Sequence, residues 1–179
     1  MRITKTELYD RYYSVYPDKA NLYLGDTAMP NHCHNRVTIY GSGNDTDETR
    51  AQIAKLKQIF EDESTFGQII PEPDWANTPN KDGELPVQPT GDNPFHVPTF
   101  KSTNRQDDRW YDWRNQNWDT KWDAYDVVVT DDDPDCTEIE FNTAWSPPEA
   151  ICHAIREQYP DLSVSWFYDE PGMEFAGYL

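Results

Sequence analysis

The sequence predicts an α+β fold in which an antiparallel sheet carries helices on one of its faces. Stretches with alternating apolar residues, typical of strands, lie between stretches in which apolar residues recur every three or four positions, typical of helices. Their order is strand, helix, insertion with helix, strand, strand, helix, strand, strand, which is close to the split β-α-β unit. With 179 residues, of which 36% are hydrophobic, the chain is long enough for one core.

Residues 1–29 are predicted to form an N-terminal extension that precedes the main domain at 30–179. Thr6 is a candidate N-cap there, and apolar residues follow at helical spacing up to Pro17. The first strand of the main domain is expected at 36–41, where apolar and polar residues alternate before a Gly-Ser-Gly turn.

The next predicted elements are a helix and a long loop. Ile53, Leu56 and Phe60 form an apolar stripe on a helix expected at 46–61, with acidic residues in its first turn. Residues 74–104 are rich in Pro, Asn, Asp and Gly and have no period. They are predicted to form a surface loop inserted in the domain, and such a loop is a candidate for function or disorder.

A second helix is expected at 105–118, followed by strands at 124–130 and 137–143. Residues 131–135, with the sequence Asp-Asp-Asp-Pro-Asp, are predicted to form the turn between these strands. In the second strand Ile139 and Phe141 alternate with Glu138, Glu140 and Asn142, so one face of the sheet should be exposed to water.

The C-terminal part is predicted to contain one helix and two strands. Residues 146–149, Ser-Pro-Pro-Glu, have the pattern of a capping box with proline at the first helical position. The helix should end at Pro160, and strands are expected at 162–168 and around 173–178.

The segment Asn31-His32-Cys33-His34-Asn35-Arg36-Val37-Thr38-Ile39, followed by Gly41, has the pattern N-x-C-x-N-x-hydrophobic-T. This pattern resembles the opening of the YubB and Api92-like proteins, a family carried by phages, plasmids and integrated elements. Four further stretches resemble the family in the expected order: Phe66 with 69–73, 110–123, 141–148, and Tyr168 with 170–177. The resemblance spans roughly residues 30–179 and implies a ferredoxin-like fold. It implies no catalytic residues. Asp119 stands where the family pattern often has glycine, and residues 1–29 precede the usual start.

Charge is concentrated in the last part of the chain. The formal net charge is −18, and 110–179 contain 16 acidic and 3 basic residues, which is −13. Such acidity argues against direct binding of nucleic acid, because phosphate-binding surfaces are built from Lys and Arg. No stretch has the length of a membrane helix and no signal peptide is recognisable, so we expect a cytoplasmic protein in a host cell.

The sequence predicts no metal site, no cofactor and no catalytic centre. His32, Cys33 and His34 could begin a zinc site with Cys136, Cys152, His153 or His96, but CxxC and HxxxH spacings are absent. Packing of Cys33 as a small hydrophobe is the preferred interpretation. The run at 131–135 could hold Ca²⁺ or Mg²⁺, but it lacks the EF-hand order. The tryptophans at 110, 113, 118 and 122 are interpreted mostly as core.

The predicted function is a non-enzymatic acidic protein of a phage or mobile element. It would bind a basic, nucleic-acid-binding surface of a host protein by imitating DNA, with restriction or CRISPR effectors as possible targets. The predicted contact residues are Asp131, Asp132, Asp133, Asp135, Glu138 and Glu140, with Asp123 and Asp126 as second choices.

Three alternatives remain open at this point. The first is a structural or assembly protein that docks through the helix at 7–16. The second is a nucleotide hydrolase with a metal bound by the Asp run. The third is a halophilic origin of the acidity, which predicts unfolding at low salt.

Overall fold

The computed structural model describes residues 31–43, 46–88 and 97–179. The chain divides into two units, Met1–Pro30 and Asn31–Leu179. The predicted N-terminal extension and its helix therefore lie outside the described residues, as does part of the predicted loop, residues 89–96.

A five-stranded sheet forms the centre of the second unit, and each neighbouring pair of its strands is antiparallel. Its strands are β1 (His32–Gly41), β4 (Tyr125–Asp133), β5 (Cys136–Ala144), β6 (Leu162–Glu170) and β7 (Phe175–Tyr178), in the spatial order β4-β5-β1-β6-β7. With helices after β1 and β5, the first four strands make two split β-α-β units, and β7 adds an edge strand. The fold is ferredoxin-like, so the predicted class is confirmed.

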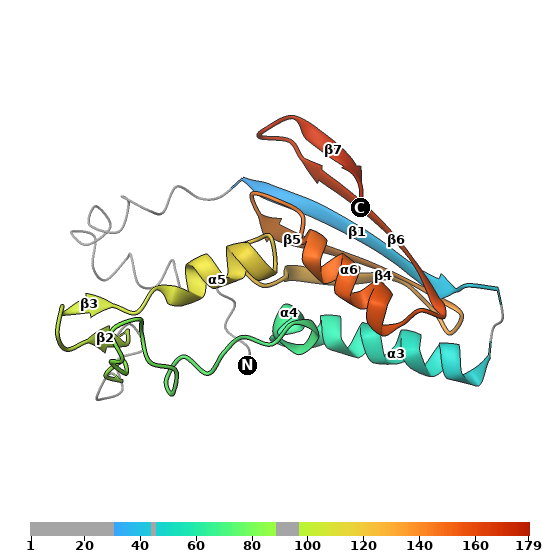
Figure 1. The fold of residues 1–179 in the computed structure, drawn as a ribbon. Helices are drawn as coiled ribbons and strands as arrows, with labels where there is room; N and C mark the ends of the chain where they lie inside the picture. The colour runs from blue at the N-terminus through green and yellow to red at the C-terminus, as the bar shows by residue number, and fades with distance from the viewer. Residues whose placement is uncertain (1–30, 44–45, 89–96) are drawn as a thin grey trace, which may run out of the picture. The chain divides into compact units, whose positions relative to one another are not determined.

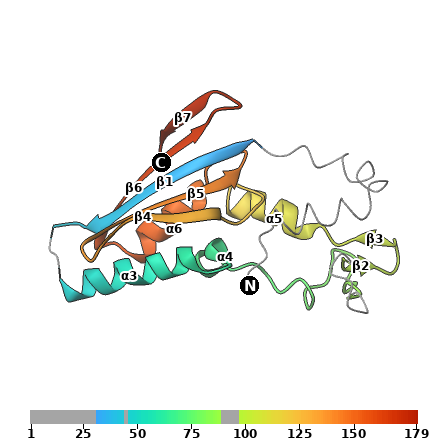
Figure 2. The ribbon, with the colours of Figure 1, turned by 180° about the vertical axis from the view of Figure 1, so that it is seen from behind.

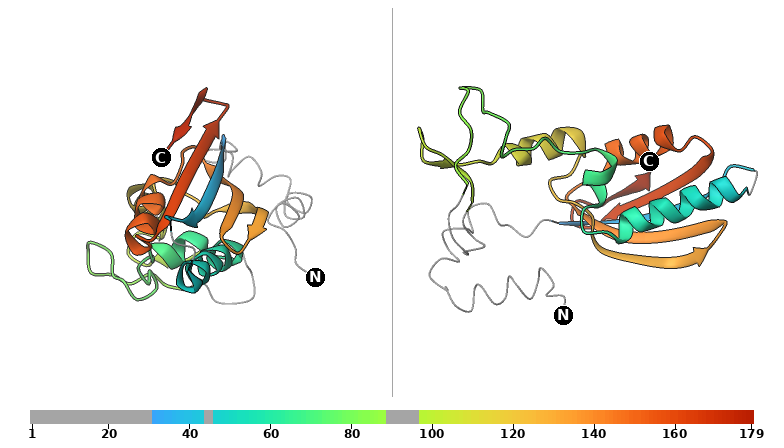
Figure 3. Two further views of the ribbon diagram at one scale, coloured as in Figure 1. Left: turned by 90° about the vertical axis from the view of Figure 1, so that its right-hand side faces the viewer. Right: turned by 90° about the horizontal axis from the view of Figure 1, so that it is seen from below.

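Helices cover one face of this sheet (Figures 1 and 3). They are α3 (Asp47–Glu61), α4 (Thr65–Ile69) and α6 (Glu149–Gln158). The reverse view places the strands in front of α6 (Figure 2). The helix α5 (Arg109–Asn117) and the small hairpin β2 (Thr99–Phe100) and β3 (Arg105–Gln106) extend beyond one end of the sheet. The opposite face, on which no helix of residues 31–43, 46–88 and 97–179 packs, is called the open face below.

The core lies between the covered face and α3 and α6. Val37 pairs with Ile139 on one side and Trp166 on the other, and all three side chains are fully buried. Phe60 of α3 packs against Phe141, with ring centroids 5.3 Å apart. Because full burial of such a side chain stabilises by about 1.5–3 kcal/mol, this alternation fixes which face of the sheet is covered.

A buried polar network explains part of the motif in β1. Asn35, on the covered face, accepts a hydrogen bond from the indole Nε1 of Trp166 at 3.0 Å and donates one to the hydroxyl of Thr143 at 2.9 Å. Thr143 in turn donates to the carbonyl of Ser146. Buried polar groups are costly unless they are paired, so this network fixes the register of β1, β5 and β6.

The sequence prediction of α3 is confirmed, and the structure shows its cap. Thr46 is the N-cap, and its hydroxyl accepts the backbone N–H of Thr49, whose side chain bonds back to Thr46. Ile53, Leu56 and Phe60 are buried, as the apolar stripe predicts.

The predicted turn at 131–135 is wrong in its extent. Residues 131–133 belong to β4, which pairs with β5 up to Asp133 and Cys136, so the turn consists only of Pro134 and Asp135. Two register shifts in β4 accommodate this longer pairing. Strand pairing overrides the turn preference of an Asp run because each paired residue satisfies a backbone hydrogen bond.

The predicted capping box at the start of α6 is also wrong. The helix begins at Glu149 with Pro148 as N-cap, and Ser146 donates instead to the carbonyl of Asp119. The carboxylate of Asp119 accepts the N–H of Ala150 at 2.9 Å and so caps α6 from another segment. Asp119 has φ 62°, a left-handed conformation that glycine adopts without steric cost. The family pattern often has glycine at this position, and the aspartate found here supplies a carboxylate that caps α6.

The predicted helix at 105–118 is shorter, because Arg105 and Gln106 form β3 and α5 starts at Arg109. Arg109 holds the described part of the 74–104 segment together. Its guanidinium donates to Asp107 at 2.7 Å and to the carbonyls of Thr78 and Trp75. This contact also lowers the pKa of Asp107. The described part is thus held by a partly buried ion pair, together with hydrogen bonds from Ser102 to Glu84 and packing of Trp75 against Trp113.

Candidate functional site: the acidic hairpin

The six first-choice carboxylates all lie on the hairpin of β4, the turn 134–135 and β5, here called the acidic hairpin. The structure divides them between two sides. The paired residues of antiparallel strands point to the same face, so the register assigns the strand carboxylates to the covered face or to the open face.

Four of these carboxylates lie on the open face. Asp131 pairs with Glu138, Asp133 pairs with Cys136, and Glu140 pairs with the exposed Val128. Successive members on one strand are two residues apart, which is about 7 Å along the strand. The predicted outward orientation of Glu138 and Glu140 is confirmed.

The hydroxyls of two threonines orient Glu138. Thr130 donates to its Oε1 at 3.0 Å, and Thr38 of β1 lies 3.4 Å from its Oε2. Within the described residues, Asp131, Asp133, Glu138 and Glu140 form no ion pair. This set of four is called the open-face acids below.

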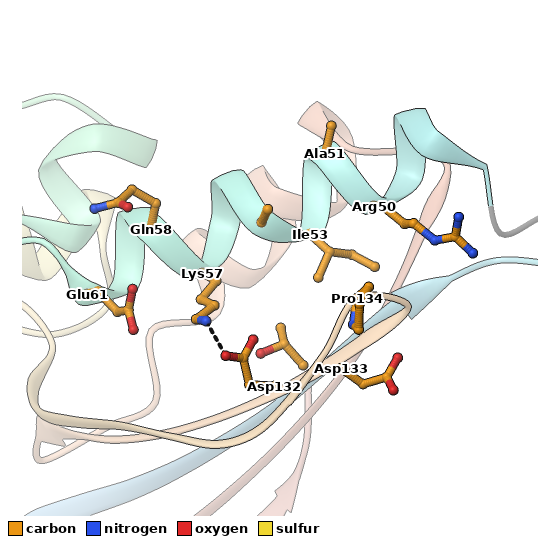
Figure 4. A pocket seen from close by; sticks show the side chains of 11 residues that line it. Arg50, Ala51, Ile53, Lys57, Gln58, Glu61, Asp132, Asp133 and Pro134 are labelled. Atoms are coloured by element: carbon orange, nitrogen blue, oxygen red, sulfur yellow. Dashed lines mark ion pairs between the residues drawn. The ribbon is translucent and has the colours of Figure 1, made fainter.

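The other two carboxylates face α3 and are paired. Asp132 accepts from the ammonium of Lys57 at 2.7 Å, and Asp135 accepts from the guanidinium of Arg50 at 2.6 Å. Each contact raises the pKa of the cation, through the side-chain hydrogen bond above all. The Lys57–Asp132 pair crosses a groove of about 710 Å³ between α3 and the hairpin, where Lys57 reaches toward Asp132 (Figure 4).

The two second-choice residues have different positions. Asp123 is mostly buried, and its carboxylate accepts the N–H groups of Phe66 and Ala124, each at 2.8 Å. Burial raises its pKa, although these hydrogen bonds oppose the shift. It therefore joins α4 to the start of β4. Asp126 is exposed, has φ 54° and lies 3.4 Å from the amide of Asn142.

The open face also contains residues that the sequence analysis did not select. Glu140, Arg36, Phe167 and Tyr178 follow one another in register across β5, β1, β6 and β7. The guanidinium of Arg36 lies 5.6 Å from the ring centroid of Phe167, and the rings of Phe167 and Tyr178 are 5.3 Å apart. Alternation in β1 and β6 could have located Arg36 and Phe167, because both flank residues predicted to be buried.

The three cysteines occupy different environments. Cys33 and Cys152 are fully buried, and burial raises the pKa of each thiol to about 11. Cys136 is partly exposed on the open face, where burial first and then Asp131, Asp133 and Glu138 raise its pKa. All three are free thiols. A thiolate is therefore disfavoured at every cysteine.

The possible metal ligands at the start of β1 point to opposite faces. Cys33 is buried, whereas His32 and His34 are exposed, and His32 Nδ1 lies 2.6 Å from the hydroxyl of Tyr125. Among residues 31–43, 46–88 and 97–179, no group of three His, Cys, Asp or Glu side chains is placed to hold a metal ion.

The interpretation of the four tryptophans as mostly core is only partly right. Trp118 is buried, and Trp113 packs against the core with its ring centroid 5.8 Å from that of Trp118. Trp110 is partly exposed and Trp122 is 36% exposed. Arg114 lies between the rings of Trp110 and Trp118, so part of this aromatic surface is covered by a cation instead of by core.

The part of the chain that the structure describes contains no helix that is both long and apolar enough to cross a membrane.

A family model supports the family resemblance in the C-terminal part of the chain. The family model described as the ferredoxin-like domain in Api92-like protein matches residues 117–179, which include β4, β5, α6, β6 and β7. A crystal structure of the protein Api92 from Yersinia pseudotuberculosis is similar with 11% sequence identity and a TM-score of 0.43, covering 84% of this chain and 93% of that one. A search of curated proteins gives no match. The resemblance to the Api92-like family, with its ferredoxin-like domain, is therefore confirmed over residues 117–179.

Proposed function

We propose that this chain is a non-catalytic binding protein whose open-face acids contact a basic, nucleic-acid-binding surface of another protein. One observation carries the proposal. Two of the six carboxylates on the acidic hairpin are neutralised by Lys57 and Arg50, while the four open-face acids have no such partner among the described residues.

Electrostatics favours a cationic partner at this surface. Two carboxylates on β4 and two on β5 form adjacent rows on the sheet face that no helix of the described residues covers. Rows of fixed negative charges attract cations over distance and accelerate association at low salt. A surface that binds nucleic acid presents Lys and Arg to rows of phosphates, so it could accept rows of carboxylates in the same way.

The direct test is affinity capture from a host lysate with three tagged forms of the full chain. The first is the wild type. The second, the open-face variant, carries Asp131→Asn, Asp133→Asn, Glu138→Gln and Glu140→Gln. The third is a matched control with the same change in net charge at exposed acids elsewhere: Glu48→Gln, Glu63→Gln, Glu157→Gln and Asp161→Asn.

Wild type and matched control should retain the same basic nucleic-acid-binding protein, and added DNA or raised salt should release it. The open-face variant should lose that protein. If the open-face variant retained it as well as the wild type does, or if no basic protein were retained by the wild type, the proposal would be wrong. Protection of Cys136 from alkylation in the complex gives a second readout, because this thiol lies beside Asp133.

A further inference from the structure

The open face has an aromatic half beside its acidic half. Tyr178 on β7 is 73% exposed, and its ring packs edge-to-face against Phe167 of β6 with a centroid distance of 5.3 Å. Tyr40 on β1 is 43% exposed and belongs to the same face. A partner that covers the open-face acids by lying across the strands would also meet these rings.

Arg36 shows which cation this surface accommodates. Its Cα position pairs with Glu140 on one side and Phe167 on the other. Its guanidinium lies 5.6 Å from the Phe167 ring centroid, and within the described residues Arg36 forms no ion pair with a carboxylate. The chain itself thus places a guanidinium against an aromatic ring at the boundary of the acidic half.

Guanidinium and ammonium groups differ in what they gain from such a surface. Both are attracted by carboxylates, but the guanidinium is planar, more weakly hydrated and able to stack on an aromatic face while it donates to an acid. An ammonium is strongly hydrated and gains less from the rings. A surface with acids and exposed rings in one row should therefore discriminate between the two.

We infer that the open face binds an arginine-rich segment of its partner, with guanidinium groups on the open-face acids and against the Phe167–Tyr178 pair. This inference rests on the proposed function and specifies the chemistry of the partner. The net charge of −18 disfavours a second copy of this chain as the occupant.

The test uses two fluorescent nine-residue peptides, one of arginine and one of lysine, titrated with the full chain at low salt. Fluorescence anisotropy gives both dissociation constants. The proteins are wild type, Tyr178→Ser, the control Tyr111→Ser at a tyrosine that is 45% exposed on α5, and the open-face variant with its matched control.

Wild type should bind the arginine peptide about fivefold more tightly than the lysine peptide, which corresponds to about 1 kcal/mol. Tyr178→Ser should bring this ratio close to one, whereas Tyr111→Ser should preserve it. The open-face variant should weaken binding of both peptides far more than its matched control does.

The outcomes separate the two proposals. Equal binding of the two peptides by wild type, or a ratio that survives Tyr178→Ser, overturns the arginine preference and leaves the acidic contact surface standing. If the open-face variant binds both peptides as tightly as its matched control does, or if wild type binds neither peptide, both proposals are overturned.

Discussion

The two faces of the sheet differ in the residues that the alternation along each strand places on them. On the covered face, Phe141 is 2% exposed and packs against Phe60 and Trp166. On the open face, the neighbouring Glu140 is exposed and has no ion pair among the described residues. The comparison shows that core residues and exposed carboxylates occupy alternate positions of one strand, so the exposed positions can be altered with little effect on the core.

The carboxylates of the acidic hairpin also differ between the two faces of the sheet. Asp132 and Asp135 are joined to α3 by Lys57 and Arg50, so they contribute to docking of the helix. The open-face acids contribute charge without a compensating cation in the described chain. A count of acidic residues would treat all six alike, although only their position decides which are available to a partner.

The largest expected difference concerns Phe141 and Glu140. Phe141→Ala should lower the free energy of unfolding by about 3–5 kcal/mol, because it leaves a cavity between Phe60, Phe66 and Trp166. Glu140→Ala, one position away, should change it by no more than about 0.5 kcal/mol. Urea unfolding followed by tryptophan fluorescence measures both. Equal losses for the two variants would contradict the assignment of the faces.

The thiols provide a second comparison, as a function of pH. Cys33 and Cys152 have a pKa of about 11 in the folded chain against an ordinary value of 9.0. Because the pKa of each thiol is raised in the folded chain, the unfolded chain releases these protons first as pH rises. The free energy of unfolding therefore has its full thiol contribution below pH 9 and loses it as pH rises toward 11. The expected loss is of the order of 2 kcal/mol for each thiol.

Urea unfolding at a series of pH values measures this loss. In a variant with Cys33→Ala and Cys152→Ala, the free energy of unfolding should fall less steeply between pH 9 and 11 than in wild type. In Cys136→Ala it should fall almost as steeply as in wild type. In mass-spectrometric alkylation of the native protein, Cys136 should react first, since it is the only one of the three that is not fully buried. Faster modification of Cys33 than of Cys136 would be inconsistent with the structure.

The polar centre of the covered face should have a smaller effect. Asn35→Ala removes the acceptor of the Trp166 indole and the donor to Thr143, and it should lower the free energy of unfolding by about 1–3 kcal/mol because buried polar groups lose their partners. The control is Thr38→Ala on the open face of the same strand, where the expected change is within about 0.5 kcal/mol. Both values come from urea unfolding. An unchanged free energy of unfolding in Asn35→Ala would mean that the hydrogen bonds of Asn35 do not support the register of β1, β5 and β6.

Much of this fold could be predicted from periodicity, but the contacts between distant segments could not. The alternation at 137–143 predicts the faces of β5, and the stripe of Ile53, Leu56 and Phe60 predicts α3. The capping of α6 by Asp119 depends on a carboxylate 31 residues away from Ala150, so no local pattern reveals it. For the same reason the sequence could not separate the open-face acids from Asp132 and Asp135, whose cations come from α3.

The smallest expected effect tests that separation within the hairpin. The open-face variant should be a few tenths of a kcal/mol more stable than wild type at low salt, because it removes repulsion between unpaired carboxylates, and salt should abolish the gain. Asp132→Asn with Asp135→Asn should have the opposite sign and lower stability at low salt, since Lys57 and Arg50 then lose their partners. Thermal unfolding at low and raised salt measures both. Effects of the same sign in the two variants would show that the two sides of the acidic hairpin are electrostatically equivalent, and the basis for selecting the open face as the contact surface would be lost.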